Sequence, residues 1–71
     1  MKYAPQHHRR VAVSESDALR VRRYVVRMGT VLAAQRALGL GDTTMAAARC
    51  GGLMLATTRD RLLAALARVG A

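Results

Sequence analysis

Closely spaced glycines are the feature that most restricts how this chain can fold. Gly29, Gly39, Gly41 and the pair Gly51 and Gly52 interrupt its middle, and glycine ends helices readily because it adopts backbone conformations that other residues avoid. Between these glycines, apolar residues recur at spacings of three and four, which is typical of amphipathic helices. No apolar run approaches the roughly 18 residues that a membrane span needs. We therefore expect several short helices.

The first two helices are marked by residues that favour helix ends. Ser14 is a typical N-cap before a run with helical periodicity, so a first helix is expected over residues 15–28, ending at the first of the glycines. Thr30 can cap a second helix over residues 31–38, and Gly39 is positioned to end it.

Two further helices follow. Asp42 opens a third one, with a carboxylate suited to the positive end of the helix dipole, and the glycine pair closes it. Thr57 and Asp60 have the spacing of a capping box, so Thr57 or Thr58 is expected to cap a last helix that stops at Gly70. Because no strand signal is present, we expect an all-α fold, a compact bundle of about four short helices.

A core without large aromatic side chains is expected to be thin. The 71 residues include no Phe or Trp and two Tyr, although 52% of them are apolar. A chain of this size buries only about 60% of its unfolded surface, so a single domain of marginal stability is expected. A homodimer would remove further apolar surface from water. The candidate interface residues are Leu53, Met54, Leu55, Leu62, Leu66 and Val69.

The first 13 residues show no sustained periodicity. They contain Pro5 and the basic pair Arg9 and Arg10. We expect a flexible basic arm over residues 1–13, followed by a helical domain over residues 14–71.

The cysteine and the histidines do not indicate a metal site or a disulfide. Cys50 is the only cysteine, so no internal disulfide can form, and a small buried thiol at a helix end is expected. His7 and His8 have no Cys or acidic neighbour at ligand spacing. Paired carboxylates, a nucleophile beside a base and a phosphate-cradling glycine loop are also lacking. We therefore expect no metal, no cofactor and no enzymatic activity.

The charge balance indicates a polyanionic partner. Eleven Arg and one Lys stand against four acidic residues, which gives a net charge of +8. A surface that serves solubility alone usually mixes both signs, so nucleic acid is favoured over solubility or an anionic membrane. The N-terminus has no apolar signal-peptide core, and a cytoplasmic protein is expected.

The tight connection of Gly39, Leu40 and Gly41 is typical of a helix-turn-helix, whose second helix lies in the major groove of DNA. Over about residues 31–70 the chain resembles helix-turn-helix regulators, and is most similar to lactose-repressor-type headpieces and lambda-repressor-like domains. Gly39 matches the turn glycine, and TTRDRLLAALARVG, residues 57–70, resembles the helix that follows. The matching buried positions are Ala34, Leu38, Leu40, Met45 and Ala48. The resemblance implies a lambda-repressor-like DNA-binding domain over residues 14–71, in which Gly41 replaces the usual Ser or Thr cap.

The same resemblance places the base-reading positions on Asp42, Thr43 and Ala47, with Ala46 nearby. Thr43 can hydrogen-bond to a base edge and the alanines can contact thymine methyl groups. Asp42 is equally consistent with a carboxylate that only stabilises the helix start. Arginines would supply most of the affinity by contacting phosphates, and the arm could enter a minor groove. The other candidate DNA-contact residues are Gln35, Thr44, Arg36, Arg49, Arg9 and Arg10.

These observations favour a sequence-specific, DNA-binding transcriptional regulator. We expect a small bacterial or phage repressor that binds double-stranded DNA at a palindromic operator as a homodimer, with two recognition helices about 34 Å apart. Two alternatives stay open. One is an adaptor or antitoxin that uses the same surface to bind a protein, and the other is a nucleoid-type binder without sequence preference.

Overall fold

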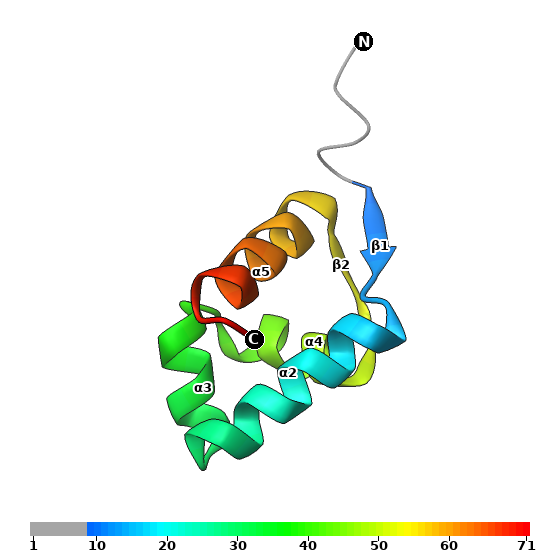
Figure 1. The fold of residues 1–71 in the computed structure, drawn as a ribbon. Coiled ribbons are helices and arrows are strands. Elements are labelled where there is room, and N and C mark those ends of the chain that lie inside the picture. Colours follow the sequence, from blue (N-terminus) through cyan, green and yellow to red (C-terminus); the bar gives the residue numbers. More distant parts are fainter. Residues whose placement is uncertain (1–8) are drawn as a thin grey trace, which may run out of the picture.

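The structure, a computed structural model, describes residues 9–71. About 70% of these residues are helical, and a small two-stranded sheet accompanies the helices (Figure 1). Among the described residues, no helix combines the length and apolar composition that crossing a membrane requires. In chain order the elements are β1 (Arg10–Ala12), α2 (Glu15–Met28), α3 (Val31–Leu38), α4 (Asp42–Cys50), β2 (Leu53–Leu55) and α5 (Ala56–Arg68).

The ends of α2 and α3 lie where the capping residues predict them. Ser14 Oγ accepts a hydrogen bond from the Asp17 amide at 3.1 Å. Thr30 Oγ1 accepts one from the Ala33 amide at 3.0 Å. Each bond satisfies a backbone donor that the first helical turn leaves without a partner. Gly39 ends α3 in the left-handed conformation, with φ of 70°.

The sheet was not predicted, so the all-α expectation is corrected to a mostly helical fold with two short strands. β1 and β2 pair antiparallel, with Val11 opposite Met54. The Val13 amide donates to the Gly52 carbonyl at 3.1 Å, and the pairing therefore continues beyond the strands. It joins segments that are far apart in sequence but neighbours in Figure 1.

The pairing also corrects the expected end of the flexible arm. Val11 and Val13 are 9% and 3% exposed, so this part of the predicted arm belongs to the folded domain. Arg9 and Arg10 are exposed, and Arg10 lies within β1. Pro5, His7 and His8 lie outside the described residues.

The start of α5 differs from the predicted capping box. The helix begins at Ala56 with Leu55 as its N-cap, and no side chain caps it. The physical reason is that β2 runs directly into α5 without a loop. Thr57 and Thr58 consequently lie inside the first turn rather than before it.

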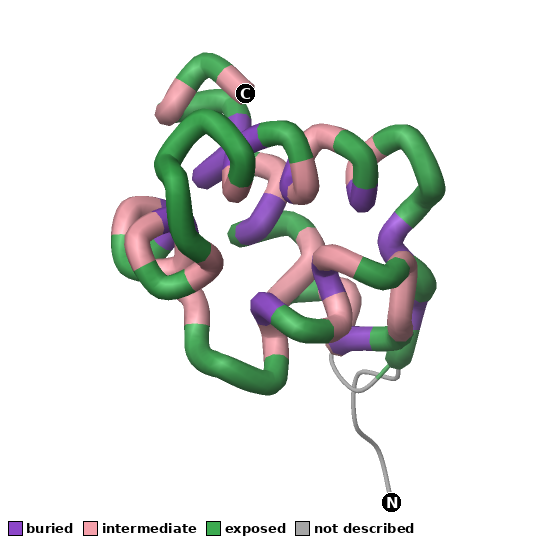
Figure 2. The backbone as a smooth tube through the Cα atoms, turned by 90° about the horizontal axis from the view of Figure 1, so that it is seen from below, coloured by how far each residue is buried: buried purple, intermediate pink, exposed green. Residues whose placement is uncertain are grey.

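The core is assembled from one face of every helix together with the sheet. Figure 2 shows buried stretches alternating with exposed ones along the chain, as amphipathic helices require. Met45, Leu62, Leu66 and Val21 are the largest fully buried side chains.

This core corrects part of the predicted dimer interface. Leu62 and Leu66 are 0% exposed and Met54 is 5% exposed, because they pack inside the chain itself. Leu55 and Val69 are half-buried, and Val69 packs against the core. Of the predicted interface residues, Leu53 alone is open to solvent, at 61%.

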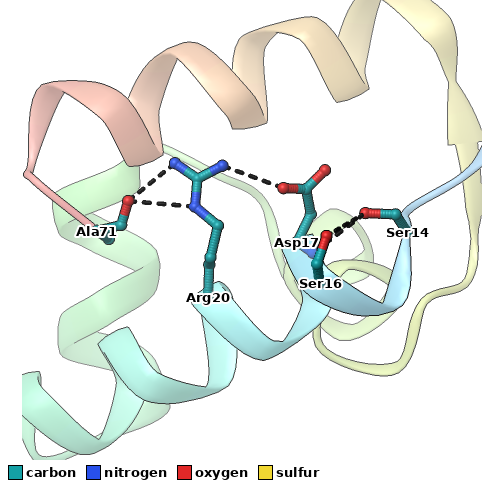
Figure 3. A network of polar contacts seen from close by, with 5 residues as sticks. All are labelled: Ser14, Ser16, Asp17, Arg20 and Ala71. Atoms are coloured by element: carbon teal, nitrogen blue, oxygen red, sulfur yellow. Dashed lines mark hydrogen bonds and ion pairs between the residues drawn. The ribbon is translucent and has the colours of Figure 1, made fainter.

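Several arginines hold the fold together instead of projecting freely. In Figure 3, Arg20 donates from Nε and Nη2 to the Ala71 carbonyl at 3.2 and 2.8 Å, and from Nη1 to Asp17 at 3.0 Å. The same view shows the Ser14 and Ser16 hydroxyls 3.2 Å apart at the start of α2. Arg20 therefore ties α2 to the segment that follows α5.

Three other arginines make comparable bonds to backbone carbonyls. Arg22 Nη1 donates to the Arg49 carbonyl at 2.7 Å and joins α2 to the end of α4. Arg27 reaches Val69, and Arg68 Nη2 donates to the Ala37 carbonyl of α3 at 2.8 Å. Four of the arginines thus form hydrogen bonds to backbone carbonyls within the chain.

Candidate nucleic-acid interface

The connection between α3 and α4 is held by backbone geometry and by one apolar side chain. The amides of Gly39 and Leu40 donate to the Arg36 and Gln35 carbonyls at 3.2 and 3.1 Å, which closes α3. Leu40 is half-buried and packs against the core, as expected for a side chain that fills the angle. Gly41 has an ordinary φ of −81° and is the N-cap of α4. The turn therefore fixes α4 relative to α3.

The inward side of α4 follows the predicted buried positions. Met45 and Ala48 are 1% and 0% exposed. Asp42, Thr43 and Ala46 are exposed along the opposite side. One side of α4 is thus anchored in the core, and the other is exposed to solvent. Thr44, Ala47 and Arg49 are half-buried at its edges.

Two of the predicted DNA-contact residues bind each other. Gln35 Nε2 donates to Asp42 Oδ1 at 2.6 Å, which joins α3 to the first turn of α4. The bond occupies part of the Asp42 carboxylate and favours its structural interpretation over base reading. Thr43 and Ala46 remain the exposed residues of α4 that suit contact with bases.

Cys50 is exposed, which corrects the expected buried thiol. Its Sγ donates to the Ala46 carbonyl at 3.3 Å. The side chain lies one turn after Ala46 on the outward side of α4, so it is turned away from the core.

The structure brings Arg10 together with α4. A groove of about 220 Å³ is lined by Arg10 of β1, by Leu53 of β2 and by Thr43, Thr44 and Ala47 of α4. The pairing of β1 with β2 is what places Arg10 there, since it aligns Arg10 opposite Leu55. Arg10 and two of the candidate base-reading residues, Thr43 and Ala47, therefore share one concave surface. Asp42 and Ala46 do not line it.

Two other predicted arginines lie apart from this groove. Arg36 is exposed and forms no side-chain bond to another described residue. Arg49 is half-buried, and its Nε has no hydrogen-bond partner among the described atoms. Neither residue lines the groove that holds Arg10.

A second set of residues next to α4 was not among the predicted DNA-contact residues. Thr58, Arg61 and Arg68 of α5 line a larger groove, of about 590 Å³, together with Thr44. Their spacings of three and seven residues put them on one face of a helix, so this signal was present in the sequence.

Comparisons of the chain with models of protein families, with curated proteins and with solved structures found no match. Within residues 9–71, no group of three or more His, Cys, Asp or Glu side chains is placed to hold a metal ion.

Proposed function

We propose that the protein binds double-stranded DNA through α4 and regulates transcription as a sequence-specific repressor. One observation carries the proposal: Thr43, an exposed residue of α4, lines a groove together with Arg10, whose side chain forms no bond to another described residue. In this proposal α3 and α4 act as a helix-turn-helix, with α4 as the recognition helix.

The charge supports a nucleic acid as the partner. Each phosphate contact made by an arginine releases counterions, so a chain with a net charge of +8 gains affinity for DNA from many small contributions. Arg10 and Arg36 are exposed cations available for such contacts. Thr43 and Ala46 would contact base edges, where a hydroxyl and a methyl group can distinguish base pairs.

Two copies on a palindromic site would supply the specificity that one short helix lacks. A single α4 spans only a few base pairs, whereas two recognition helices about 34 Å apart read two half-sites. Since Leu62, Leu66 and Met54 are core residues, a dimer needs other surfaces. Val26 and Leu32 are 81% and 51% exposed and are available for one.

Selection from a pool of randomised duplexes at ~150 mM salt tests the proposal, because salt at this level suppresses purely electrostatic attraction. We expect enrichment of a two-fold symmetric site. Recovery of duplexes with no shared sequence would contradict sequence-specific regulation and favour a nucleoid-type binder.

A protein-binding role is the second candidate, and the composition of α4 favours it. The exposed residues Asp42, Thr43, Ala46 and Cys50 include no Arg, Asn or Gln for a bidentate base contact. An adaptor or antitoxin would bind random and selected duplexes equally weakly while binding its protein partner through α4.

A further inference from the structure

The larger groove beside α4 has the chemistry of a phosphate site. Its walls are the turn between α3 and α4, Thr44 of α4, and a stripe of α5 that contains Thr58, Arg61, Ala64 and Arg68. It therefore offers two hydroxyls and two guanidinium groups, and no carboxylate is among its lining residues. Hydroxyls and guanidinium groups are the side-chain groups that bind phosphate oxygens in DNA complexes.

The two arginines of this groove differ in their hydrogen bonds to the rest of the described chain. Arg68 Nη2 donates to the Ala37 carbonyl at 2.8 Å, which holds its guanidinium group against α3. Arg61 is exposed and forms no side-chain bond to another residue within 9–71. Between them lies Ala64, whose small, exposed side chain leaves the groove open. One cation is thus already positioned, and the other is free to meet a ligand.

This groove is continuous with the groove that contains Arg10. Thr44 and Thr58 line both of them, so the two concave surfaces meet at these residues. Arg10 lies in one groove, and Arg61 and Arg68 lie in the other. A DNA duplex that receives α4 in its major groove presents a sugar-phosphate strand on each side of the helix.

We propose that the groove between α4 and α5 seats the DNA backbone, with Arg61 and Arg68 binding the phosphates of one strand. The inference rests on the proposed DNA binding and adds to it a second element, α5, as a contact to the duplex. Phosphate contacts of this kind fix the register of the recognition helix without reading sequence.

A matched pair of charge insertions tests this assignment. Ala64→Glu places a carboxylate inside the groove, whereas Ala67→Glu adds the same charge to an exposed position of α5 that does not line it. Both variants have the same net charge, and both replace an exposed alanine with another good helix former. We expect Ala64→Glu to lose roughly tenfold more duplex affinity than Ala67→Glu, because its carboxylate would repel the phosphates that Arg61 and Arg68 bind.

A second pair measures the number of phosphate contacts. Arg61→Gln is expected to reduce the slope of log affinity against log salt by about 0.9, the value for one lost contact. Arg23→Gln, which removes an exposed cation of α2 that lines neither groove, is expected to leave the slope unchanged. Thermal unfolding of all four variants checks that each one folds.

The outcomes separate this inference from the proposed function. Equal affinity losses in Ala64→Glu and Ala67→Glu, together with equal slopes in the two Arg variants, would overturn the backbone site while a selected operator sequence still stands. A specific effect of Ala64→Glu on duplexes without any preferred sequence would support the backbone site and contradict sequence-specific regulation. If the wild-type chain binds no duplex at low salt, both proposals fail.

Discussion

The same substitution, glycine to serine, is expected to have opposite effects at Gly39 and Gly41. Gly39 has φ of 70°, in the left-handed region, and Gly41 has φ of −81°. A Cβ atom added at either position meets nothing within 4 Å, so steric clashes do not contribute to the difference in stability between the two variants. Only the backbone conformation and the ability to cap α4 distinguish the two sites.

The magnitudes follow from these conformations. Gly39→Ser forces a side chain into the left-handed region, which costs about 1–2 kcal/mol. Gly41→Ser occupies an N-cap that lacks a side-chain bond at present. A hydroxyl there gains a few tenths of a kcal/mol over glycine, and the loss of glycine freedom in the unfolded chain adds about 0.4–1 kcal/mol. Gly41→Ser is therefore predicted to raise the free energy of unfolding by about 1 kcal/mol.

Thermal unfolding followed by the helical circular dichroism signal measures both changes. For a domain of this size, a change of 1 kcal/mol shifts the midpoint by about 4–8 °C, so the two variants should differ by roughly 10 °C or more. Equal midpoints for Gly39→Ser and the wild type would refute the left-handed turn. A destabilised Gly41→Ser would refute the assignment of Gly41 as the N-cap.

Three further changes probe the caps, the core and the interface. Ser14→Ala removes the hydroxyl that accepts from the Asp17 amide, and should lower the free energy of unfolding by about 1 kcal/mol in a denaturant titration. Met45→Ala empties a fully buried position and should cost about 2–5 kcal/mol, as much as a small core supplies, so loss of the helical signal at room temperature is expected. Arg36→Ala removes an exposed cation available for phosphate contact and should weaken binding to selected and random duplexes by the same factor in fluorescence anisotropy; unchanged affinity for both would remove Arg36 from the interface.

The helices could be predicted because their ends depend on local chemistry. Ser14, Thr30 and Gly39 act within one turn of their own position, so the bounds of α2 and α3 agree with the sequence prediction. The buried positions Met45 and Ala48 also follow from helical spacing alone. Such signals do not depend on how distant segments meet.

The sheet and the dimer surface could not be predicted in this way. β1 and β2 have three residues each, too few for an alternating pattern, and they pair across most of the chain. Because the pairing could not be predicted, the position of Arg10 beside α4 could not be predicted either. The periodicity of Leu62 and Leu66 shows an apolar face, but it does not tell whether the chain or a partner covers that face.

The most direct test of α4 as the DNA-binding surface is a titration of the protein's amide NMR spectrum with a short duplex. We expect the largest shifts in Asp42–Cys50 and at Arg10, with small shifts along the outer side of α2. Shifts concentrated on α2, with the amides of α4 unchanged at saturating duplex, would contradict the account.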